Sequence, residues 1–343
     1  MKKNFVTLAI ISVVLVYLVI VAGALVRMTG SGMGCPDWPK CFGYYIPPTD
    51  IKQLLWTPNH DYSKSQVIIK DEKLLVATSD FQSTENFDQK NWRTYTKHDY
   101  AIFNAVETWI EYINRLIGAL AGLAVLVMAI FSISYWKKNK SVTLFSWLSV
   151  ILMGFQGWLG ARVVYSVLNP LKITIHMMVA LMIVAVLLYI ISKSSKKISN
   201  FVFDSKFKKI LIITLILTFF QIVLGTQVRQ FVDEQVKSLG YYQMGKVLEN
   251  PTVIFYVHRS FSILILALNV YLLYRNKILK LGFQKINWVM LLIGVEIFSG
   301  MAMYYLDFPY TTQPIHLVIA SLLFGFQFYL VLENTQKKSN EIF

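Results

Sequence analysis

The chain has 343 residues, of which 55% are hydrophobic, with a formal net charge of +14 and a mean hydropathy of +0.51. Its length allows one large soluble protein or a membrane protein with many spans, and its charge would suggest a nucleic acid partner if it were soluble. The basic residues lie mostly in alternate loops between long apolar runs. Membrane topology explains such a pattern better, and we expect no nucleic acid partner.

Apolar runs of roughly 20 residues recur along the chain, and a run of this length can cross a hydrocarbon layer as a helix. Backbone groups in lipid must be hydrogen-bonded within their own segment, which favours helices over strands. The sequence therefore predicts an all-α integral membrane protein of eight transmembrane helices. The expected spans are 6–26, 109–132, 142–165, 173–192, 208–228, 252–274, 287–306 and 315–332.

The first run, 6–26, follows Lys2 and Lys3 and could be mistaken for a cleaved signal peptide. It is longer than the usual signal core of about 7–15 residues, so we interpret it as the first span. The chain enters this span within a few residues, and no mitochondrial targeting segment is expected. We therefore favour a bacterial cell (cytoplasmic) membrane.

Basic residues gather on one side of the membrane if every run is a full crossing. The positive-inside rule assigns that side to the cytoplasm. Both termini are then predicted to be cytoplasmic, and the long loop 27–108 to lie outside. The basic segments are Lys2 with Lys3, 137–140, 193–209, 275–285, and Lys337 with Lys338.

The long loop contains both cysteines of the chain, Cys35 and Cys41, in the segment Gly-Cys-Pro-Asp-Trp-Pro-Lys-Cys. A disulfide is plausible because outer compartments are oxidising, and a pair of free thiols with a redox role is the alternative. His60 and His98 of this loop have no ligand-like spacing, so we assign both to a solvated surface.

The two halves of the chain share an internal repeat, which predicts two pseudo-symmetric four-helix bundles. The first half is expected at 1–200, including the outer loop 27–108, and the second at 201–343. Three pairs of segments carry the repeat: Gly-Ala-Leu-Val-Arg at 23–27 with Gly-Thr-Gln-Val-Arg at 225–229, Tyr-Ile-Asn-Arg at 112–115 with Tyr-Val-His-Arg at 256–259, and Thr-Ile-His at 174–176 with Pro-Ile-His at 314–316.

A short motif, a polar residue four positions before a glycine, recurs in the third, fifth and seventh apolar runs. The polar residues are Gln156, Gln221 and Glu296. The glycine allows two helices to approach closely, and the polar side chain can bond across the contact. We predict this packing role for Gln156 and Gln221. Glu296 is a carboxylate at membrane depth, and its place in the series predicts a protonated or paired structural group.

Three of the five histidines, His176, His258 and His316, lie inside predicted spans near their outer ends. Intramembrane ionisable groups usually face the interior of the bundle. Two imidazoles that face each other there can hold a haem iron from both sides, which is what we predict for His258 and His316. The alternative is two histidines bonded to neighbouring helices, and the use of the same positions in both halves weighs against it.

The first half carries an altered version of this pair. His176 is retained, but its partner position is Asn114, and asparagine is a poor iron ligand. Glu111 lies one helical turn earlier, where the second half has Phe255. One half therefore resembles a closed bis-histidine site for electron transfer, and the other an open site beside an acid or base.

Arginines stand at the outer ends of several runs, where they could simply extend to the membrane surface. Haem carries two propionates, and arginine pairs well with carboxylates. Arg115 and Arg259, each next to a ligand position, are candidate propionate anchors, and Arg27 and Arg229 occupy matching positions in the two halves.

These residues together resemble the haem A synthase family, whose members oxidise a methyl group of haem O to the formyl group of haem A for cytochrome oxidase. The resemblance covers nearly the whole chain. Its motifs are Arg-Met-Thr-Gly-Ser-Gly-Met-Gly-Cys-Pro-Asp-Trp-Pro from Arg27, Glu-x-x-Asn-Arg at 111–115, Ile175-His176, Val257-His258-Arg259 and Ile315-His316.

The resemblance implies haem B held by His258 and His316 in the second half. It implies that haem O, the substrate, binds in the first half, with His176 as a ligand, Glu111 as the catalytic carboxylate and Asn114 beside them. It also implies a Cys35–Cys41 disulfide. Expected partners are haem O, haem O synthase, cytochrome oxidase assembly factors and a quinone or other electron acceptor, and a homo-oligomer stays open.

Two features depart from the family pattern. Many members have histidine at the position of Asn114, so the substrate iron has three candidate ligations: His176 alone, water, or a residue of the long loop. That loop is also longer than in the simplest members and is a candidate docking surface for haem O synthase. Two other classes are alternatives: a diheme electron-transfer cytochrome or haem carrier, and a transporter, which the clustering of histidines at one interface disfavours.

Overall fold

The computed structural model describes residues 2–195, 201–309 and 311–335. Within this part of the chain, eight helices are long and apolar enough to cross a membrane, which confirms the predicted number of spans. They are α1 (Lys2–Met28), α2 (Ala105–Ser132), α3 (Lys140–Tyr165), α4 (Pro170–Ser194), α5 (Ser205–Leu239), α6 (Val253–Ile278), α7 (Lys285–Tyr305) and α8 (Thr312–Thr335).

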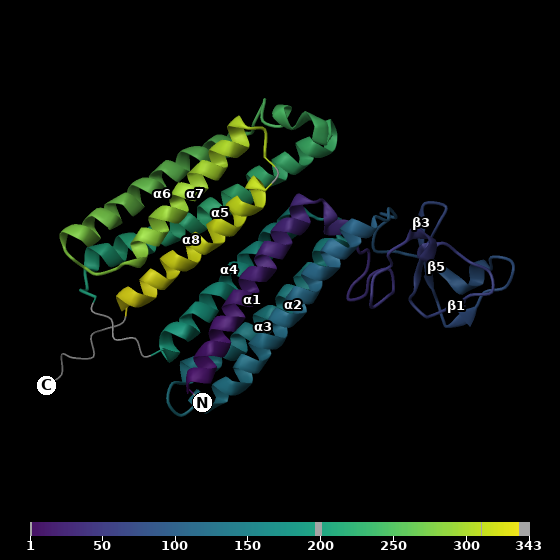
Figure 1. Cartoon of the computed structure of the whole chain (residues 1–343), viewed down its shortest axis with the longest axis horizontal. Helices are drawn as coiled ribbons and strands as arrows, with labels where there is room; N and C mark the ends of the chain where they lie inside the picture. Colours follow the sequence, from purple (N-terminus) through teal and green to yellow (C-terminus); the bar gives the residue numbers. More distant parts are fainter. Residues whose placement is uncertain (1, 196–200, 310, 336–343) are drawn as a thin grey trace.

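The helices form two groups of four that lie side by side (Figure 1). Helices α1–α4 pack on one another, as do α5–α8, and α8 also contacts α1 and α4. Helix α1 begins and α8 ends at the end of the bundle opposite to the long loop 27–108. Of the basic segments, 196–200, Lys337 and Lys338 lie outside the described residues. The cytoplasmic placement of the termini, the pseudo-symmetry and the boundary at residue 200 stay predictions.

Each group of helices has its own apolar core, while many of its other apolar side chains face outwards. Phe5, Met128 and Leu187 are fully buried in the first group, and Phe207 and Phe283 in the second. The outward-facing side chains include Leu123, Phe220 and Phe298, which are 57%, 55% and 70% exposed. Such a surface suits lipid, where apolar side chains need no burial against protein.

Helix α5 is much longer than predicted, because it continues from the expected end at residue 228 to Leu239. The added turns contain charged residues, so a hydropathy pattern cannot reveal them. Arg229 and Asp233 form an i,i+4 ion pair at 2.7 Å, and Gln230 donates to Glu234 at 2.8 Å, which supports these turns beyond the apolar span.

The long loop 27–108 folds into a small module of short strands, which the all-α prediction did not include (Figure 1). Strands β2 (Val67–Lys70), β3 (Lys73–Ala77) and β5 (Trp92–Thr94) form one antiparallel sheet, in the order β2-β3-β5. Strands β1 (Asp61–Tyr62) and β4 (Phe81–Gln82) form a second pair. The helical turns η1 (Ser31–Met33), η2 (Ile51–Leu54) and η3 (Gln89–Asn91) complete the module.

The hairpin of β2 and β3 explains why the sequence analysis missed the strands. Its two turn residues, Asp71 and Glu72, both have positive φ angles, of 50° and 56°. Such a turn usually contains Asn-Gly or Asp-Gly, and Asp-Glu gives no such signal. The module also corrects the assignment of His98 to a solvated surface, since this side chain is half-buried and its Nε2 lies 3.0 Å from the carbonyl oxygen of Pro36.

Asp204 connects α5 to α6 at the end of the bundle opposite to the module. Its carboxylate caps α5 by accepting from the Phe207 amide at 2.6 Å, and it accepts two bonds from Arg275 at 2.7 and 2.8 Å. The Arg275 guanidinium holds the pKa of Asp204 below its usual value.

We expect Asp204→Ala to lower the free energy of unfolding by about 1–2 kcal/mol, because it removes a helix cap and an ion pair. Asp204→Asn keeps the cap and should cost less. Because the folded pKa is lowered, the contribution is complete above the unfolded pKa of about 3.9 and is lost as pH falls through the folded pKa. Thermal unfolding of both variants in detergent at pH 7 measures the difference, and equal stabilities would contradict it.

Candidate haem site

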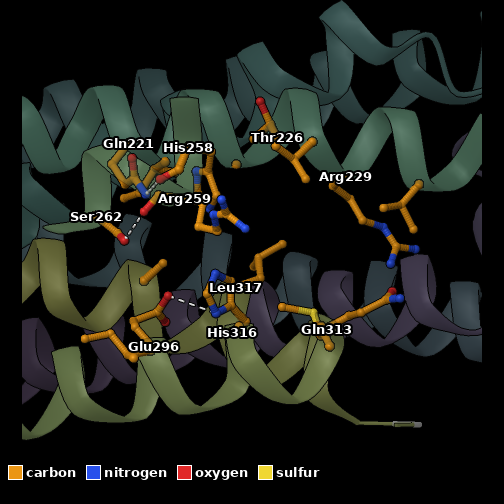
Figure 2. Close-up of a pocket in the computed structure, with 18 of the residues that line it drawn as sticks. Gln221, Thr226, Arg229, His258, Arg259, Ser262, Glu296, Gln313, His316 and Leu317 are labelled. Atoms are coloured by element: carbon orange, nitrogen blue, oxygen red, sulfur yellow. Dashed lines mark hydrogen bonds and ion pairs between the residues drawn. The ribbon is translucent and has the colours of Figure 1, made fainter. Parts of the chain in front are cut away.

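A cavity of about 400 Å³ opens among α5–α8 and reaches α1 and α4. Its lining is mostly apolar, as is usual for sites that bind large organic groups. A few polar side chains converge on it, from α5, α6, α7 and α8 (Figure 2). They include Gln221, Arg229, His258, Glu296 and His316.

His258 of α6 and His316 of α8 face each other across this cavity (Figure 2). Their ring centres are 6.4 Å apart, and the ring planes are inclined at 68°. Two imidazoles that bind one metal ion from opposite sides, each at about 2 Å, place their ring centres about 6 Å apart. The observed spacing, the apolar walls and the two nitrogen donors fit a haem held by both histidines.

Each of these histidines is supported by a residue of a neighbouring helix. The amide of Gln221 on α5 donates to the carbonyl oxygen of His258 at 2.9 Å. On α7, Glu296 Oε2 lies 3.1 Å from His316 Nδ1, and Ser299 Oγ lies 2.9 Å from the same nitrogen. The prediction that Glu296 is a paired group is thus confirmed, but its partner is a candidate ligand.

The histidine of the first half has the same kind of support. On α3, the Gln156 amide donates to the carbonyl oxygen of His176 at 2.9 Å. The predicted bonding of Gln156 and Gln221 across helix contacts is therefore confirmed. Within the described part of the chain, His176 Nδ1 and Asn114 Oδ1 are buried without a hydrogen-bond partner, and neither residue lines the cavity of His258 and His316.

Three glycines leave room for the three imidazoles. A Cβ atom built on Gly160 would lie 3.6 Å from His176 Cε1, one on Gly225 would lie 3.1 Å from His258 Cε1, and one on Gly300 would lie 3.7 Å from His316 Cε1. Only the contact at Gly225 is tighter than ordinary van der Waals packing.

We expect Gly225→Ala to weaken haem B binding, since His258 would have to move and overpacking of this kind costs about 1–3 kcal/mol. Gly300→Ala is the matched control, because its methyl group meets His316 at an ordinary distance. Titration of the haem-free proteins with haem B measures both affinities. Equal affinities would contradict the prediction.

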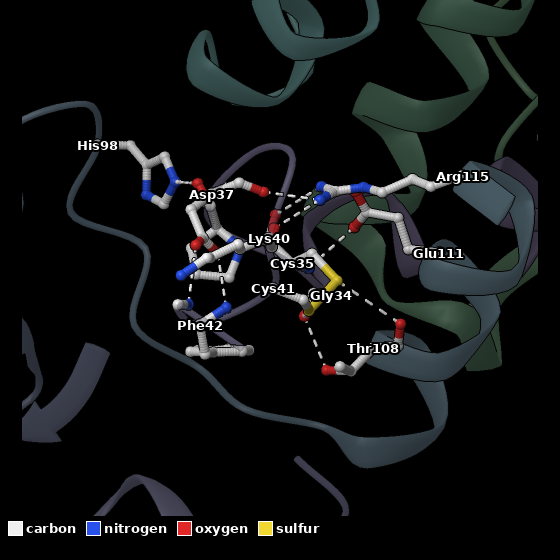
Figure 3. The surroundings of a disulfide bond; sticks show 12 residues. Gly34, Cys35, Asp37, Lys40, Cys41, Phe42, His98, Thr108, Glu111 and Arg115 are labelled. Carbon is white, nitrogen blue, oxygen red and sulfur yellow. Dashed lines mark hydrogen bonds and ion pairs between the residues drawn. A yellow bond between two sulfur atoms is a disulfide. The ribbon is translucent and has the colours of Figure 1, made fainter. Parts of the chain in front are cut away.

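Glu111 lies beneath the disulfide loop (Figure 3) and does not line the cavity of His258 and His316. It is 4% exposed, and it accepts from the Cys35 amide at 2.9 Å and from Arg115 at 2.6 Å. The Cys35–Cys41 disulfide is present, with an S–S distance of 2.09 Å, which confirms the predicted pairing over free thiols. The carboxylate therefore joins α2 to the loop that carries the disulfide.

Arg115 is also engaged by this loop. Its guanidinium donates to the carbonyl oxygens of Cys35, Asp37 and Lys40, at 3.1, 2.7 and 3.0 Å. These bonds hold the cysteine loop to α2. The same bonds occupy guanidinium N–H groups of Arg115 that were predicted to bind a haem propionate. The binding of a propionate by Arg115 stays a prediction.

The other arginines that are candidates to bind a haem propionate lie around the cavity of His258 and His316. Arg27 of α1 and Arg229 of α5 both pair with Asp233, each at 2.7 Å, so this carboxylate links the two groups of helices. The Arg259 guanidinium lies over the rings of Phe255 and Tyr256, at 5.9 and 5.3 Å from their centres. All three arginines line the cavity.

Sequence reasoning did not find Asp233 or Ser299. Asp233 lies in the unpredicted extension of α5, and a serine inside an apolar span gives no signal by itself. The repeated glycines were a usable signal, but their spacing to the polar residue suggested helix packing and did not indicate the histidines.

The fold and the cavity define a multi-pass membrane protein in which two half-buried histidines face one cavity. The model of the cytochrome oxidase assembly protein family, COX15-CtaA, matches residues 6–66 and 62–328. The chain belongs to this family, and the predicted relationship to haem A synthases is confirmed.

The relatives of this chain include proteins of several organisms that carry the name "Heme A synthase". The protein of Shewanella oneidensis is 26% identical over 63% of this chain and 54% of its own length. That of Alkalihalophilus pseudofirmus is 26% identical over 54% of this chain and 44% of its own length, so the matched part spans about half of each of these two relatives. That of Listeria welshimeri is 21% identical over 100% of this chain and 99% of its own length.

Proposed function

We propose that this chain has haem A synthase activity, oxidising the methyl group of haem O to a formyl group by way of the hydroxymethyl haem. The observation that carries the proposal is the asymmetry of the two halves. His258 and His316 have the spacing of two ligands to one metal, at 6.4 Å between ring centres. The matching place in the first half has His176 with Asn114, and Glu111 one turn away.

The second half would hold haem B through His258 and His316. The iron of a bound haem supplies one-electron chemistry. Arg27, Arg229 and Arg259 line the same cavity, and their guanidinium groups suit the two propionates. Asp233 already neutralises part of this charge, so a propionate that reaches Arg27 or Arg229 would compete with Asp233.

The first half would bind haem O, with His176 as the retained ligand. Two successive hydroxylations of the methyl carbon would give a gem-diol, which loses water to become the aldehyde. With water as the source of oxygen, each hydroxylation releases two protons and two electrons, and the electrons pass to a quinone or another acceptor. In this scheme Glu111 accepts or returns a proton at its carboxylate, next to Asn114. The surrounding bonds from Cys35 and Arg115 fix the orientation of the carboxylate and keep bulk water away from it.

The cellular setting follows the same proposal. The chain would lie in a bacterial cytoplasmic membrane, with the β-strand module outside and both termini in the cytoplasm. The module would be a docking surface for haem O synthase or for cytochrome oxidase assembly factors. A quinone or another acceptor would take the electrons.

The number and ligation of the bound haems test this proposal against a diheme electron carrier. After purification from a host supplied with haem O, we expect one low-spin bis-histidine haem B and a second porphyrin in a different ligation state. Electron paramagnetic resonance and the absorbance of the reduced protein distinguish the two. Two low-spin bis-histidine haems of unmodified type would favour the carrier.

A further inference from the structure

Three helices of this fold each support one histidine with a polar residue and a glycine four positions later. On α3 and α5 the polar residue is glutamine, and its amide donates to the backbone carbonyl of His176 or His258. On α7 the residue is Glu296, and it bonds to the imidazole ring of His316 instead. Glu296 therefore acts on a ring nitrogen of His316, where it can change how strongly this histidine donates to a bound metal.

The contacts around His316 indicate which of its two ring nitrogens carries the proton. The Ser299 hydroxyl lies 3.1 Å from the carbonyl oxygen of Glu296, which can accept its proton. In that arrangement Ser299 Oγ accepts from His316 Nδ1, which is 2.9 Å away. The carboxylate oxygen Oε2 of Glu296 lies 3.1 Å from the same nitrogen. A proton on His316 Nδ1 is the arrangement that both oxygens favour, and it leaves the lone pair of Nε2 free.

His258 has no comparable support on its ring. Among the described residues, its Nδ1 is buried without a hydrogen-bond partner, and the ring faces the backbone of Gln221 instead of a carboxylate. A second partner on the outer nitrogen of a ligating histidine fixes the tautomer and raises the basicity of the ligand. The two ligands therefore differ in the strength with which they can donate to a metal.

We propose that Glu296 and Ser299 are positioning residues that orient His316 and make it the more strongly donating of the two ligands of the bound haem B. This inference rests on the proposed function only in taking haem B as the occupant of the cavity. Stronger donation stabilises the oxidised iron, so the pair lowers the reduction potential of that haem.

Glu296→Gln is the direct test, because glutamine already occupies the matching positions on α3 and α5. An amide oxygen is a weaker acceptor than a carboxylate. We expect the variant to bind haem B to within about twofold of the wild-type level, with a higher midpoint potential in a spectroelectrochemical titration. The electron paramagnetic resonance g values of the oxidised haem should also change. Ser299→Ala should raise the potential less.

Ser262→Ala is the matched control. Ser262 lines the same cavity, and its hydroxyl donates to the carbonyl oxygen three residues earlier, as that of Ser299 does. No contact joins it to a histidine ring among the described residues, so its removal should leave the potential unchanged.

Wild-type potentials and g values in both Glu296→Gln and Ser299→Ala, with haem B bound, would overturn the inference. If Glu296→Gln fails to hold haem, Ser299→Ala decides alone. The oxidation of haem O is assayed separately in the same preparations. A shifted potential in a chain whose wild type never oxidises haem O would refute the proposed function and leave the role of Glu296 standing.

Discussion

Replacement of Glu111 by glutamine is expected to lower the rate of haem A formation by about 10²–10⁴-fold, the range that proton transfer by a positioned side chain contributes. Glutamine has the shape of glutamate and can still accept from the Cys35 amide, but it cannot carry the proton. The haem B content should stay at the wild-type level, because Glu111 does not line the cavity of His258 and His316. Chromatography of the extracted porphyrins measures both quantities.

A control must separate proton transfer by Glu111 from its hold on the disulfide loop. Thr108→Val provides it, since the Thr108 hydroxyl donates to the carbonyl oxygen of Gly34 at 2.7 Å, which is a second bond between α2 and the same loop. We expect Thr108→Val to loosen the loop but to retain most of the activity. Equal losses in Thr108→Val and Glu111→Gln would mean that Glu111 acts only by holding the loop.

Removal of either ligand of the second half should have the second large effect. We expect His258→Ala and His316→Ala each to weaken haem B binding by more than the roughly 10–100-fold that loss of an outer-shell partner typically costs at a metal site. The low-spin bis-histidine signal should disappear in both. Haem titration and electron paramagnetic resonance of the purified proteins measure the two effects.

His60→Ala is the appropriate comparison, because His60 is an exposed histidine of the outer module. Its haem content and spectrum should match those of the wild type. A normal low-spin haem in both His258→Ala and His316→Ala would show that other residues hold the iron.

The sequence predicted the eight spans because each needs only a long apolar run, a property of neighbouring residues. It failed where stability depends on contacts that a hydropathy pattern does not contain. The end of α5 at Leu239 is supported by polar pairs such as Arg229 with Asp233. The module of the outer loop is built from strands of two to five residues joined by an atypical Asp71-Glu72 turn.

The candidate site was predicted in part, through the internal repeat. The repeat identified His258 and His316 as a pair, and the structure places their ring centres 6.4 Å apart. It could not identify what supports them, because a packing contact between helices has no fixed sequence separation. Gln156 reaches a histidine 20 residues away, whereas Gln221 reaches one 37 residues away.

The roles of Glu111 and Arg115 depend on the same kind of distant contact. Arg115 bonds to the carbonyl oxygen of Cys35, 80 residues earlier in the chain. In the sequence Arg115 stands next to a predicted ligand position, which suggests that it binds a haem propionate. Only the folded loop reveals that its guanidinium faces the disulfide segment.

The identity of the porphyrins bound after supply of haem O is the most direct test of the proposed activity. The protein would be purified from a host that makes haem O and has no other haem A-forming enzyme, and its extracted porphyrins identified by chromatography and mass. We expect haem A or its hydroxymethyl precursor beside haem B. Haem B together with unchanged haem O would contradict the proposed oxidation and would favour a haem carrier.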